Sequence, residues 1–378
     1  MCELKKFFCV PFFSECPLAK YRFTGIIVVE KRSYSIYETF HVQESGDFVK
    51  SSSAPTMKDV AREAGVALGT VSKVFNDLPV GEEYRRRVLK AADDLGYQVN
   101  SYARGLKTRK TYTVAMILPN VVTPFFAALA QHICHALTKR GYRMLLSVTD
   151  FDPEAEQQYI RMAQQNKVDG IIGLTYNPAL QVDSGVPFVS FDRYFSPDVP
   201  CVASDNFGGG QLAAKKLVEL GCRRLLFLRT GSRVPGESDK RGDGFEAFCR
   251  ANGVEHAALR LYDGDGYEPF RTFLKAHMEN GKLLYDGIFC STDRLALDIR
   301  KMLSSLGLRV PEDVQLIGFD GVPLYANGEF PCSTIVQPIP QLAETCVDIL
   351  LRESTSDLPS LICLPVNYAA GGTTLDNT

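Results

Sequence analysis

Side chains suited to binding phosphate gather in residues 56–107 of this 378-residue chain. Between Met57 and Lys110 there are eleven Lys and Arg against seven Asp and Glu, a local net charge of +4, whereas the whole chain carries −2. The rest of the chain therefore carries −6. Cationic side chains neutralise nucleic-acid phosphates, so a small basic segment joined to an acidic body indicates one part that meets nucleic acid and one that does not.

A second kind of chemistry, acid–base catalysis, would need side chains such as Asp192, Asp293 and Asp320, which could form a carboxylate cluster. The sequence has no nucleophile elbow, no H-E-x-x-H, no G-x-x-x-x-G-K-[ST] and no strand followed by G-x-G-x-x-G. His132 and His135 are better interpreted as part of a helix than as metal ligands. We therefore expect no catalytic residues, no cofactor and no metal.

Three short helices are predicted to position the basic segment. The first begins at a capping-box-like Thr56 and Asp59 and ends at Gly65. The second spans about residues 68–76, and the third about 82–95. Their predicted shared core is Val60, Ala64, Val71, Val74, Phe75, Val88, Leu89, Ala92 and Leu95. Two short helices across a tight turn, followed by a basic segment, are the layout of a helix-turn-helix DNA reader.

From Thr113 onward, short apolar runs alternate with helical patterns. The predicted strands are 114–118, 144–148, 170–174, 186–191, 225–228, 287–290 and 314–319. Strands that are apolar on both faces and separated by single helices indicate parallel sheets covered on both sides. Ligands of such sheets bind beyond the carboxyl ends of the strands, and Asp320 lies at such an end.

Cysteine usage and hydropathy indicate the compartment. The eleven cysteines include no C-x-x-C pair and no zinc-ligand spacing, which favours a reducing environment. No apolar run approaches the roughly 18 to 20 residues of a membrane span. We expect a cytoplasmic protein without membrane contact. Residues 1–55 end in a Ser-rich linker and are either an extension of unknown role or the result of a mis-assigned start.

An ordered set of short motifs runs through residues 56–375. It comprises Asp59-Val60-Ala61, Ala64-Gly65-Val66, residues 70–76, Gly96-Tyr97, Ala103-Arg104, Pro124-Phe125-Phe126, residues 168–172, Ser204-Asp205-Asn206, Thr292-Asp293, residues 310–314, Gly318-Phe319-Asp320 and residues 333–338. Together these motifs resemble the lac repressor/gal repressor family of bacterial transcription regulators. The resemblance implies an N-terminal all-α helix-turn-helix DNA-binding domain and a two-lobed α/β effector domain of the type I periplasmic-binding-protein fold, with parallel sheets.

The resemblance also implies domain boundaries. The helix-turn-helix domain would span residues 56–98, and a hinge helix with its linker 99–112. The effector-binding and dimerisation domain would span 113–375. Within it, the N-lobe would comprise about 113–204 and 338–366, and the C-lobe about 205–337 and 367–375.

By the same resemblance, the second helix enters the major groove. Leu68, Gly69 and Lys73 occupy base-reading positions, with Lys73 the donor to a guanine. The positions suited to phosphate are Thr70, Ser72 and Asn76. The predicted hinge contacts are Asn100, Ala103, Arg104, Leu106 and Lys107.

Leu106 would enter the minor groove as a wedge in a hinge helix that forms on operator DNA. The alternative for this segment alone is a basic linker. The chain departs from the family pattern twice, with Ala67 where Ser usually opens the reading helix and Val99 where Pro precedes the hinge. Both departures are expected to weaken operator binding.

The effector implied by the resemblance is a small molecule, with a sugar or sugar derivative the first choice. Hydroxyl groups need carboxylates, amides and a guanidinium, and a sugar ring needs an aromatic wall. The family positions that supply them are Asp192, Arg241, Asp320 and Gln337 as polar contacts, Phe125 and Phe126 as the wall, and Asn206, Thr292 and Asp293 beside them. Asp205 and Asp293 could instead cap helices. Phe125 and Phe126 could instead be core residues.

The predicted partners are operator double-stranded DNA, the effector and a second copy of the chain, because two half-sites need two heads. Three alternatives keep the fold but change the function. A nucleobase or a partner protein could replace the sugar, or the chain could be a sugar-binding protein of the transport type.

Overall fold

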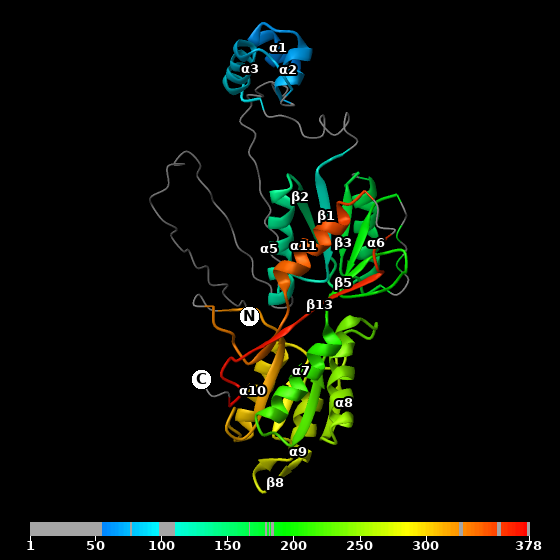
Figure 1. The fold of residues 1–378 in the computed structure, drawn as a ribbon, viewed down its shortest axis with the longest axis vertical. Helices are drawn as coiled ribbons and strands as arrows, with labels where there is room; N and C mark the ends of the chain where they lie inside the picture. Colours follow the sequence, from blue (N-terminus) through cyan, green and yellow to red (C-terminus); the bar gives the residue numbers. More distant parts are fainter. Residues whose placement is uncertain are drawn as a thin grey trace, which may run out of the picture. The chain divides into compact units, whose positions relative to one another are not determined.

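The protein, in a computed structural model, is described over residues 55–75, 78–97, 110–165, 167–177, 180, 182, 185–324, 328–353 and 357–375. The contacts divide the chain into two units, Met1–Gln98 and Val99–Thr378 (Figure 1). We call the described part of the first unit the head and that of the second unit the body. The predicted extension, residues 1–55, lies outside the described residues except for Pro55.

The head consists of α1 (Met57–Ala64), α2 (Leu68–Phe75) and α3 (Glu82–Asp94). The predicted capping box is confirmed, because the Asp59 N–H donates to the Thr56 hydroxyl at 3.4 Å and the Thr56 N–H donates to the Asp59 carboxylate at 2.9 Å. Gly65 ends α1 with a φ of +61°, in the left-handed region that favours glycine. These local signals are strong enough to define the start and end of α1 from sequence alone.

The core of the head is a small cluster of Val and Ala side chains. Its fully buried members are Val60, Ala61, Ala64, Val71, Val74, Val88, Ala91 and Ala92. The prediction that Leu89 belongs to this core is wrong, since Leu89 is 49% exposed. The reason is helical geometry. About 3.6 residues per turn place Val88, Ala91, Ala92 and Leu95 on one stripe and rotate Leu89 roughly 100° away from Val88.

A Thr56→Ala variant is expected to lower the local stability of α1 by about 1 kcal/mol, because the free N–H groups of the first turn lose an acceptor. Thr56→Ser retains the hydroxyl and serves as the matched control. Amide hydrogen exchange on the intact chain measures the effect as faster exchange in α1. Equal exchange rates in wild type and Thr56→Ala would show that the capping box does not stabilise the helix.

The N-lobe of the body contains a parallel sheet with strand order β13-β5-β4-β3-β1-β2 (Figure 1). Its strands are β1 (Thr113–Leu118), β2 (Arg143–Val148), β3 (Gly170–Gly173), β4 (Phe188–Phe191), β5 (Cys201–Ser204) and β13 (Leu361–Leu364). Alternate residues of β1 face α5 (Pro124–Lys139) and α11 (Ile339–Leu350) on one side and α6 (Pro153–Gln165) on the other. The predicted parallel sheet covered on both sides is confirmed.

The C-lobe repeats this architecture with strand order β14-β12-β11-β10-β6-β7, in which only β14 is antiparallel to its neighbour. Its strands are β6 (Arg224–Arg229), β7 (Glu255–Arg260), β10 (Gly287–Cys290), β11 (Gln315–Asp320), β12 (Thr334–Val336) and β14 (Asn367–Ala369). One face is covered by α7 (Asn206–Glu219) and α8 (Lys240–Ala251), and the other by α9 (Glu268–Ala276) and α10 (Asp293–Ser305). The short η1 (Glu237–Asp239) precedes α8, and β8 (Met278–Glu279) pairs with β9 (Lys282–Leu283).

The chain passes between the two sheets three times. The crossings lie between β5 and α7, between β12 and α11, and between β13 and β14. Residues just after β5 and β12 therefore lie where the two lobes meet. Within the described ranges, no helix is both long and apolar enough to cross a membrane.

Candidate functional site

The exposed surface of α2 carries the residues predicted to read bases. Leu68 is 44% exposed, and Gly69 and Lys73 are also exposed, whereas Val71 and Val74 are buried. A Cβ atom added at Gly69 would meet nothing within 4 Å. The first turn of α2 therefore presents an open face, as a helix that enters a DNA groove requires.

The remaining predicted DNA contacts fall into two groups. Thr70 and Ser72 are half-buried on α2. The others lie outside the described residues, namely Asn76, Asn100, Ala103, Arg104, Leu106 and Lys107.

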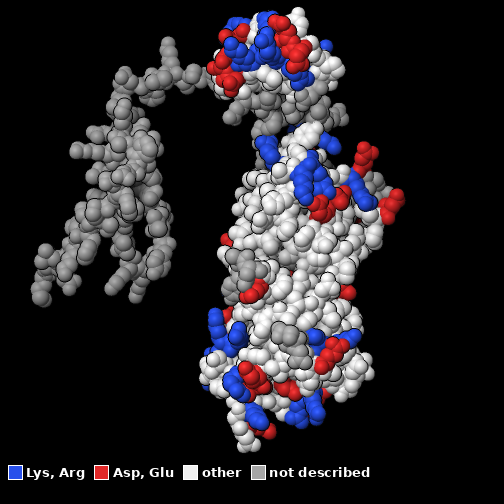
Figure 2. Space-filling model, turned by 60° about the vertical axis from the view of Figure 1, so that its left-hand side comes forward, with Lys and Arg blue, Asp and Glu red and all other residues white. Residues whose placement is uncertain are grey.

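Charges of both signs are interspersed over the head, as Figure 2 shows. Arg62 pairs with Asp59 at 2.7 Å. Arg87 donates to the carbonyl oxygens of Ala64 at 2.5 Å and Gly65 at 3.2 Å. Arg87 thus joins α3 to the end of α1, so it has a structural role that sequence reasoning missed.

In the body, five of the nine predicted effector residues form a continuous polar chain between the lobes. Asn206, the first residue of α7, donates to the Asp192 carboxylate beyond β4 at 3.1 Å. The Asn206 side-chain oxygen accepts from Arg241 Nε of α8 at 2.7 Å. We call the chain of Asp192, Asn206, Arg241, Asp320 and Gln337 the interlobe network.

The second half of this network surrounds Asp320, the last residue of β11. Arg241 Nη1 lies 3.6 Å from Asp320 Oδ1 and donates to the Ser291 carbonyl at 2.6 Å. Gln337 Nε2 donates to Asp320 Oδ1 at 2.9 Å, and the Ser204 hydroxyl donates to Gln337 Oε1 at 2.7 Å. Ser204 and Ser291 were not predicted as site residues, although Ser204 is the last residue of β5 and Ser291 follows β10.

Close packing of α7 against α8 positions Arg241 and Asn206. A Cβ atom at Gly210 would lie 1.9 Å from the Arg241 carbonyl oxygen, and one at Gly244 would lie 2.0 Å from that of Phe207. Both positions therefore require glycine. The Arg241 guanidinium also lies 3.7 Å from the centre of the Phe319 ring.

The interlobe network contains more acids than bases. Burial raises the pKa of Asp320 to about 8, with Arg241 acting to lower it and Asp293 to raise it. Burial likewise raises the pKa of Asp192 to about 6. A carboxyl whose pKa is raised toward 7 can be protonated or ionised near neutral pH. It can therefore donate or accept hydrogen bonds, which suits hydroxyl ligands.

Two predicted residues beside the network have structural contacts. The Thr292 hydroxyl accepts from the Leu295 N–H at 3.2 Å and so caps α10. Asp293, predicted as a possible cap, instead accepts from the Gly321 N–H at 2.9 Å and from the Thr334 hydroxyl at 2.5 Å.

Asp205 caps a helix, which was one of the interpretations of this residue from the sequence. Its carboxylate accepts from the Gly208 N–H at 2.8 Å at the start of α7. The backbone N–H of Gly208 therefore has a partner within the chain.

The predicted aromatic wall is largely core. Phe125 is 5% exposed, and its ring lies 5.9 Å from that of Phe191. Phe126 is half-buried against the same cluster, with its ring 6.0 Å from Phe125. The core interpretation of Phe125 is confirmed, and Phe126 is the more accessible of the pair.

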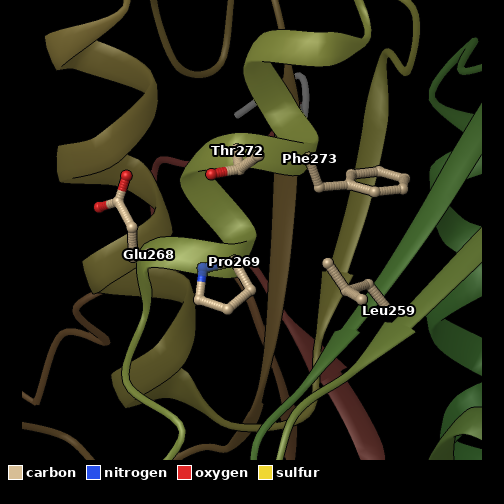
Figure 3. A pocket seen from close by; sticks show the side chains of 5 residues that line it. All are labelled: Leu259, Glu268, Pro269, Thr272 and Phe273. Carbon is tan, nitrogen blue, oxygen red and sulfur yellow. The ribbon is translucent and has the colours of Figure 1, made fainter.

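An open groove of about 430 Å³ lies elsewhere in the C-lobe, between β7 and α9 (Figure 3). It is lined by Leu259, Glu268, Pro269, Thr272 and Phe273 and contains no predicted site residue. Among the described residues, no three His, Cys, Asp or Glu side chains are grouped as metal ligands.

The head and the body each match a known protein family. The family "Bacterial regulatory proteins, lacI family" matches residues 56–100, and the family "Periplasmic binding protein-like domain" matches residues 214–374. The sucrose operon repressor of Pediococcus pentosaceus is 32% identical over 329 residues, which cover 84% of this chain and 99% of that protein. The ribose operon repressor of Bacillus subtilis (strain 168) is 32% identical over 330 residues, covering 84% and 98%.

Solved structures share the fold. The lac repressor dimer bound to operator and the anti-inducer ONPF aligns with a TM-score of 0.72 and 23% identity, covering 85% of this chain and 99% of that one. The complex of the transcriptional regulator CelR with cellobiose aligns with a TM-score of 0.57 and 28% identity, covering 84% and 99%. The chain therefore belongs to the LacI family of bacterial regulatory proteins and is a transcriptional repressor rather than an enzyme.

Proposed function

We propose that this repressor binds a palindromic operator as a homodimer and that a neutral sugar or sugar derivative, held by the interlobe network, controls this binding. The observation that carries the proposal is the network itself, a buried set of hydrogen-bonding side chains shared by both lobes. The similarity of the chain to the sucrose and ribose operon repressors supports a sugar as the ligand.

The chemistry of the network favours a neutral polyol. Sugar hydroxyls both donate and accept hydrogen bonds, so they match the carboxyls of Asp192 and Asp320 as well as the guanidinium of Arg241. The carboxyls of Asp192, Asp293 and Asp320 outnumber the one guanidinium, so the site offers no surplus positive charge to an anionic ligand. A sugar phosphate is disfavoured for this reason.

Control of DNA binding would follow from the position of the network between the lobes. Asp192 belongs to the N-lobe, whereas Asn206 and Arg241 belong to the C-lobe. A ligand that binds one lobe arrangement better than another shifts the population between them. The hinge helix predicted, together with its linker, in residues 99–112 would transmit that shift by allowing or preventing the pairing of two hinge helices.

Lys73→Ala is expected to raise the operator dissociation constant about tenfold, since a good contact to a base contributes about 1 to 3 kcal/mol of discrimination. Lys73 is exposed on α2, beside Gly69. A mobility-shift titration with palindromic promoter fragments and random competitor DNA, with and without sugars, gives both the affinity and the sign of the effector response. Lys90→Ala, an exposed lysine of α3, is the matched control.

The result that overturns the proposal is equally direct. If the wild-type protein prefers no palindromic promoter fragment over random DNA, whichever sugar is added, it is not a sugar-controlled operator binder. If Lys73→Ala and Lys90→Ala weaken specific binding equally, Lys73 contributes only charge and reads no base.

A further inference from the structure

We propose that the effector site continues beyond Arg241 to a second group of side chains, Tyr176 and Phe151 of the N-lobe with Arg229 and Asp263 of the C-lobe, and that the effector therefore has two sugar rings. This inference rests on the proposed function above and specifies its ligand class. None of these four residues was singled out by the sequence motifs.

On the N-lobe, the residues of the second group lie beyond the ends of strands. Asp192 lies beyond the end of β4, Tyr176 lies beyond β3, and Phe151 lies beyond β2. The rings of Tyr176 and Phe151 lie 5.3 Å apart, and Phe151 is 44% exposed with a φ of +63°. A non-glycine residue in the left-handed region is uncommon and gathers at functional sites. An exposed Phe151 beside a half-buried Tyr176 at the carboxyl edge of a parallel sheet is suited to the apolar face of a sugar ring.

The C-lobe supplies the polar half of the second group. Arg229, the last residue of β6, is 6% exposed and is held by an ion pair with Asp239 and a hydrogen bond of 3.3 Å to the Ser232 carbonyl. Asp263 follows β7 and remains exposed, and its N–H donates to the Gly231 carbonyl at 3.0 Å. A fixed guanidinium and an accessible carboxylate thus lie at neighbouring strand ends.

Charged side chains of both groups act on Tyr176. Burial raises the pKa of its hydroxyl, as do the charges of Asp192 and Asp263, whereas Arg241 and Arg229 lower it. The Tyr176 hydroxyl is thus within electrostatic reach of the interlobe network on one side and of the second group on the other.

The segment between β6 and α8 joins the same two groups. The Glu237 N–H of η1 donates to the Asp192 carbonyl at 3.0 Å. Asp239, two residues further, holds Arg229. The N-lobe acid of the first group and the arginine of the second are therefore held by one short helix.

Each group repeats one set of chemical features, with a carboxylate, a guanidinium and a nearby aromatic ring. In the first group these are Asp320, Arg241 and Phe319, and in the second they are Asp263, Arg229 and Tyr176. A single sugar ring would use one set, whereas a disaccharide would use both. Because acids accompany both guanidiniums, a neutral disaccharide fits better than a phosphorylated one.

Isothermal titration calorimetry on the full-length protein tests this inference. The probes are the disaccharides sucrose, cellobiose, maltose, lactose and trehalose and the monosaccharides glucose, fructose, galactose and ribose. At least one disaccharide is expected to bind ten times more tightly than every monosaccharide. Tyr176→Phe and Asp263→Asn should each raise the dissociation constant of that disaccharide tenfold and change monosaccharide binding less than twofold.

Matched controls separate this effect from a loss of folding. Tyr159→Phe, which changes a tyrosine packed on the other face of the N-lobe sheet, and Asp198→Asn, which changes an exposed aspartate, should leave disaccharide binding unchanged. Because Asp263 is exposed, its variant remains informative even if Tyr176→Phe is unstable.

The outcomes distinguish this inference from the proposed function. A monosaccharide that binds as tightly as every disaccharide would overturn the two-ring effector alone. So would equal losses of monosaccharide and disaccharide binding in both variants. Failure of all the sugars to bind wild-type protein would overturn the sugar-controlled repressor as well.

Discussion

Arg241→Ala is expected to weaken effector binding at least 100-fold and to abolish the response of operator binding to sugar. Arg241 contacts three polar partners in the body, namely Asn206, the Ser291 carbonyl and Asp320. Removing the cation from a buried ion pair leaves a carboxyl without its partner and costs about 3 to 5 kcal/mol. A loss of 100-fold in affinity corresponds to about 2.7 kcal/mol, just below this range, so the expected loss is at least 100-fold.

The measurement is an operator-binding curve at increasing sugar concentration, combined with calorimetry for the sugar itself. Arg250→Ala is the matched control, because Arg250 lies on the same helix but is exposed and pairs with Glu246 at 3.1 Å. Arg241→Lys keeps the charge but loses the planar fork, so it should recover only part of the affinity. A wild-type response curve for Arg241→Ala would remove Arg241 from the effector site.

The predictions of helices and strands succeeded where a pattern was long or a terminus carried a specific signal. The box of Thr56 and Asp59 with Gly65 defines α1, and apolar runs such as 314–319 coincide with buried strands. The strands missing from the prediction all have four residues or fewer except β7, and they are β5, β7, β8, β9, β12, β13 and β14. Runs this short carry little periodic signal and form strands because their neighbours in the sheet pair with them.

The candidate site likewise contains residues that were predicted from the sequence and residues that were not. The family resemblance predicted the members of the interlobe network, because residues such as Asp320 lie at the ends of predicted strands. The packing of Gly210 against α8 could not be predicted, since it depends on the close approach of two separate helices, α7 and α8. Tyr176 and Arg229 were missed because they lie on different lobes and no family motif includes either of them.

The stability of the body without effector is expected to fall as pH rises from about 4 to about 8, with Asp320 the main cause. Burial raises the pKa of Asp320 from its ordinary value of 3.8 to about 8 in the folded chain. Between these values the folded chain holds a proton that the unfolded chain has released, so unfolding is favoured as pH rises. The stabilisation that the Asp320 proton contributes is complete below about pH 4 and is lost by about pH 8. Over this range its contribution to the free energy of unfolding falls by at most about 1.4 kcal/mol per pH unit.

Asp320→Asn should flatten this decline and make the variant more stable than wild type at pH 8. The amide cannot ionise, yet its oxygen can still accept the hydrogen bond from Gln337 Nε2. Thermal melts of sugar-free protein in buffers from pH 6 to 8 measure the slope. Asp313→Asn is the matched control, because hydrogen bonds from Arg309 lower the pKa of Asp313 to about 2, far outside this range.

The same carboxyl links pH to sugar affinity. Hydroxyls that donate to Asp320 favour its charged form, so sugar binding should lower its pKa and release protons near pH 7. By linkage, sugar affinity then rises with pH between about 6 and 8. Calorimetry in two buffers of different ionisation enthalpy counts the protons, and Asp320→Asn should reduce the release. If wild type and Asp320→Asn release equal numbers of protons and melt with the same pH slope, the buried proton belongs to another group, and Asp293 is the next to replace.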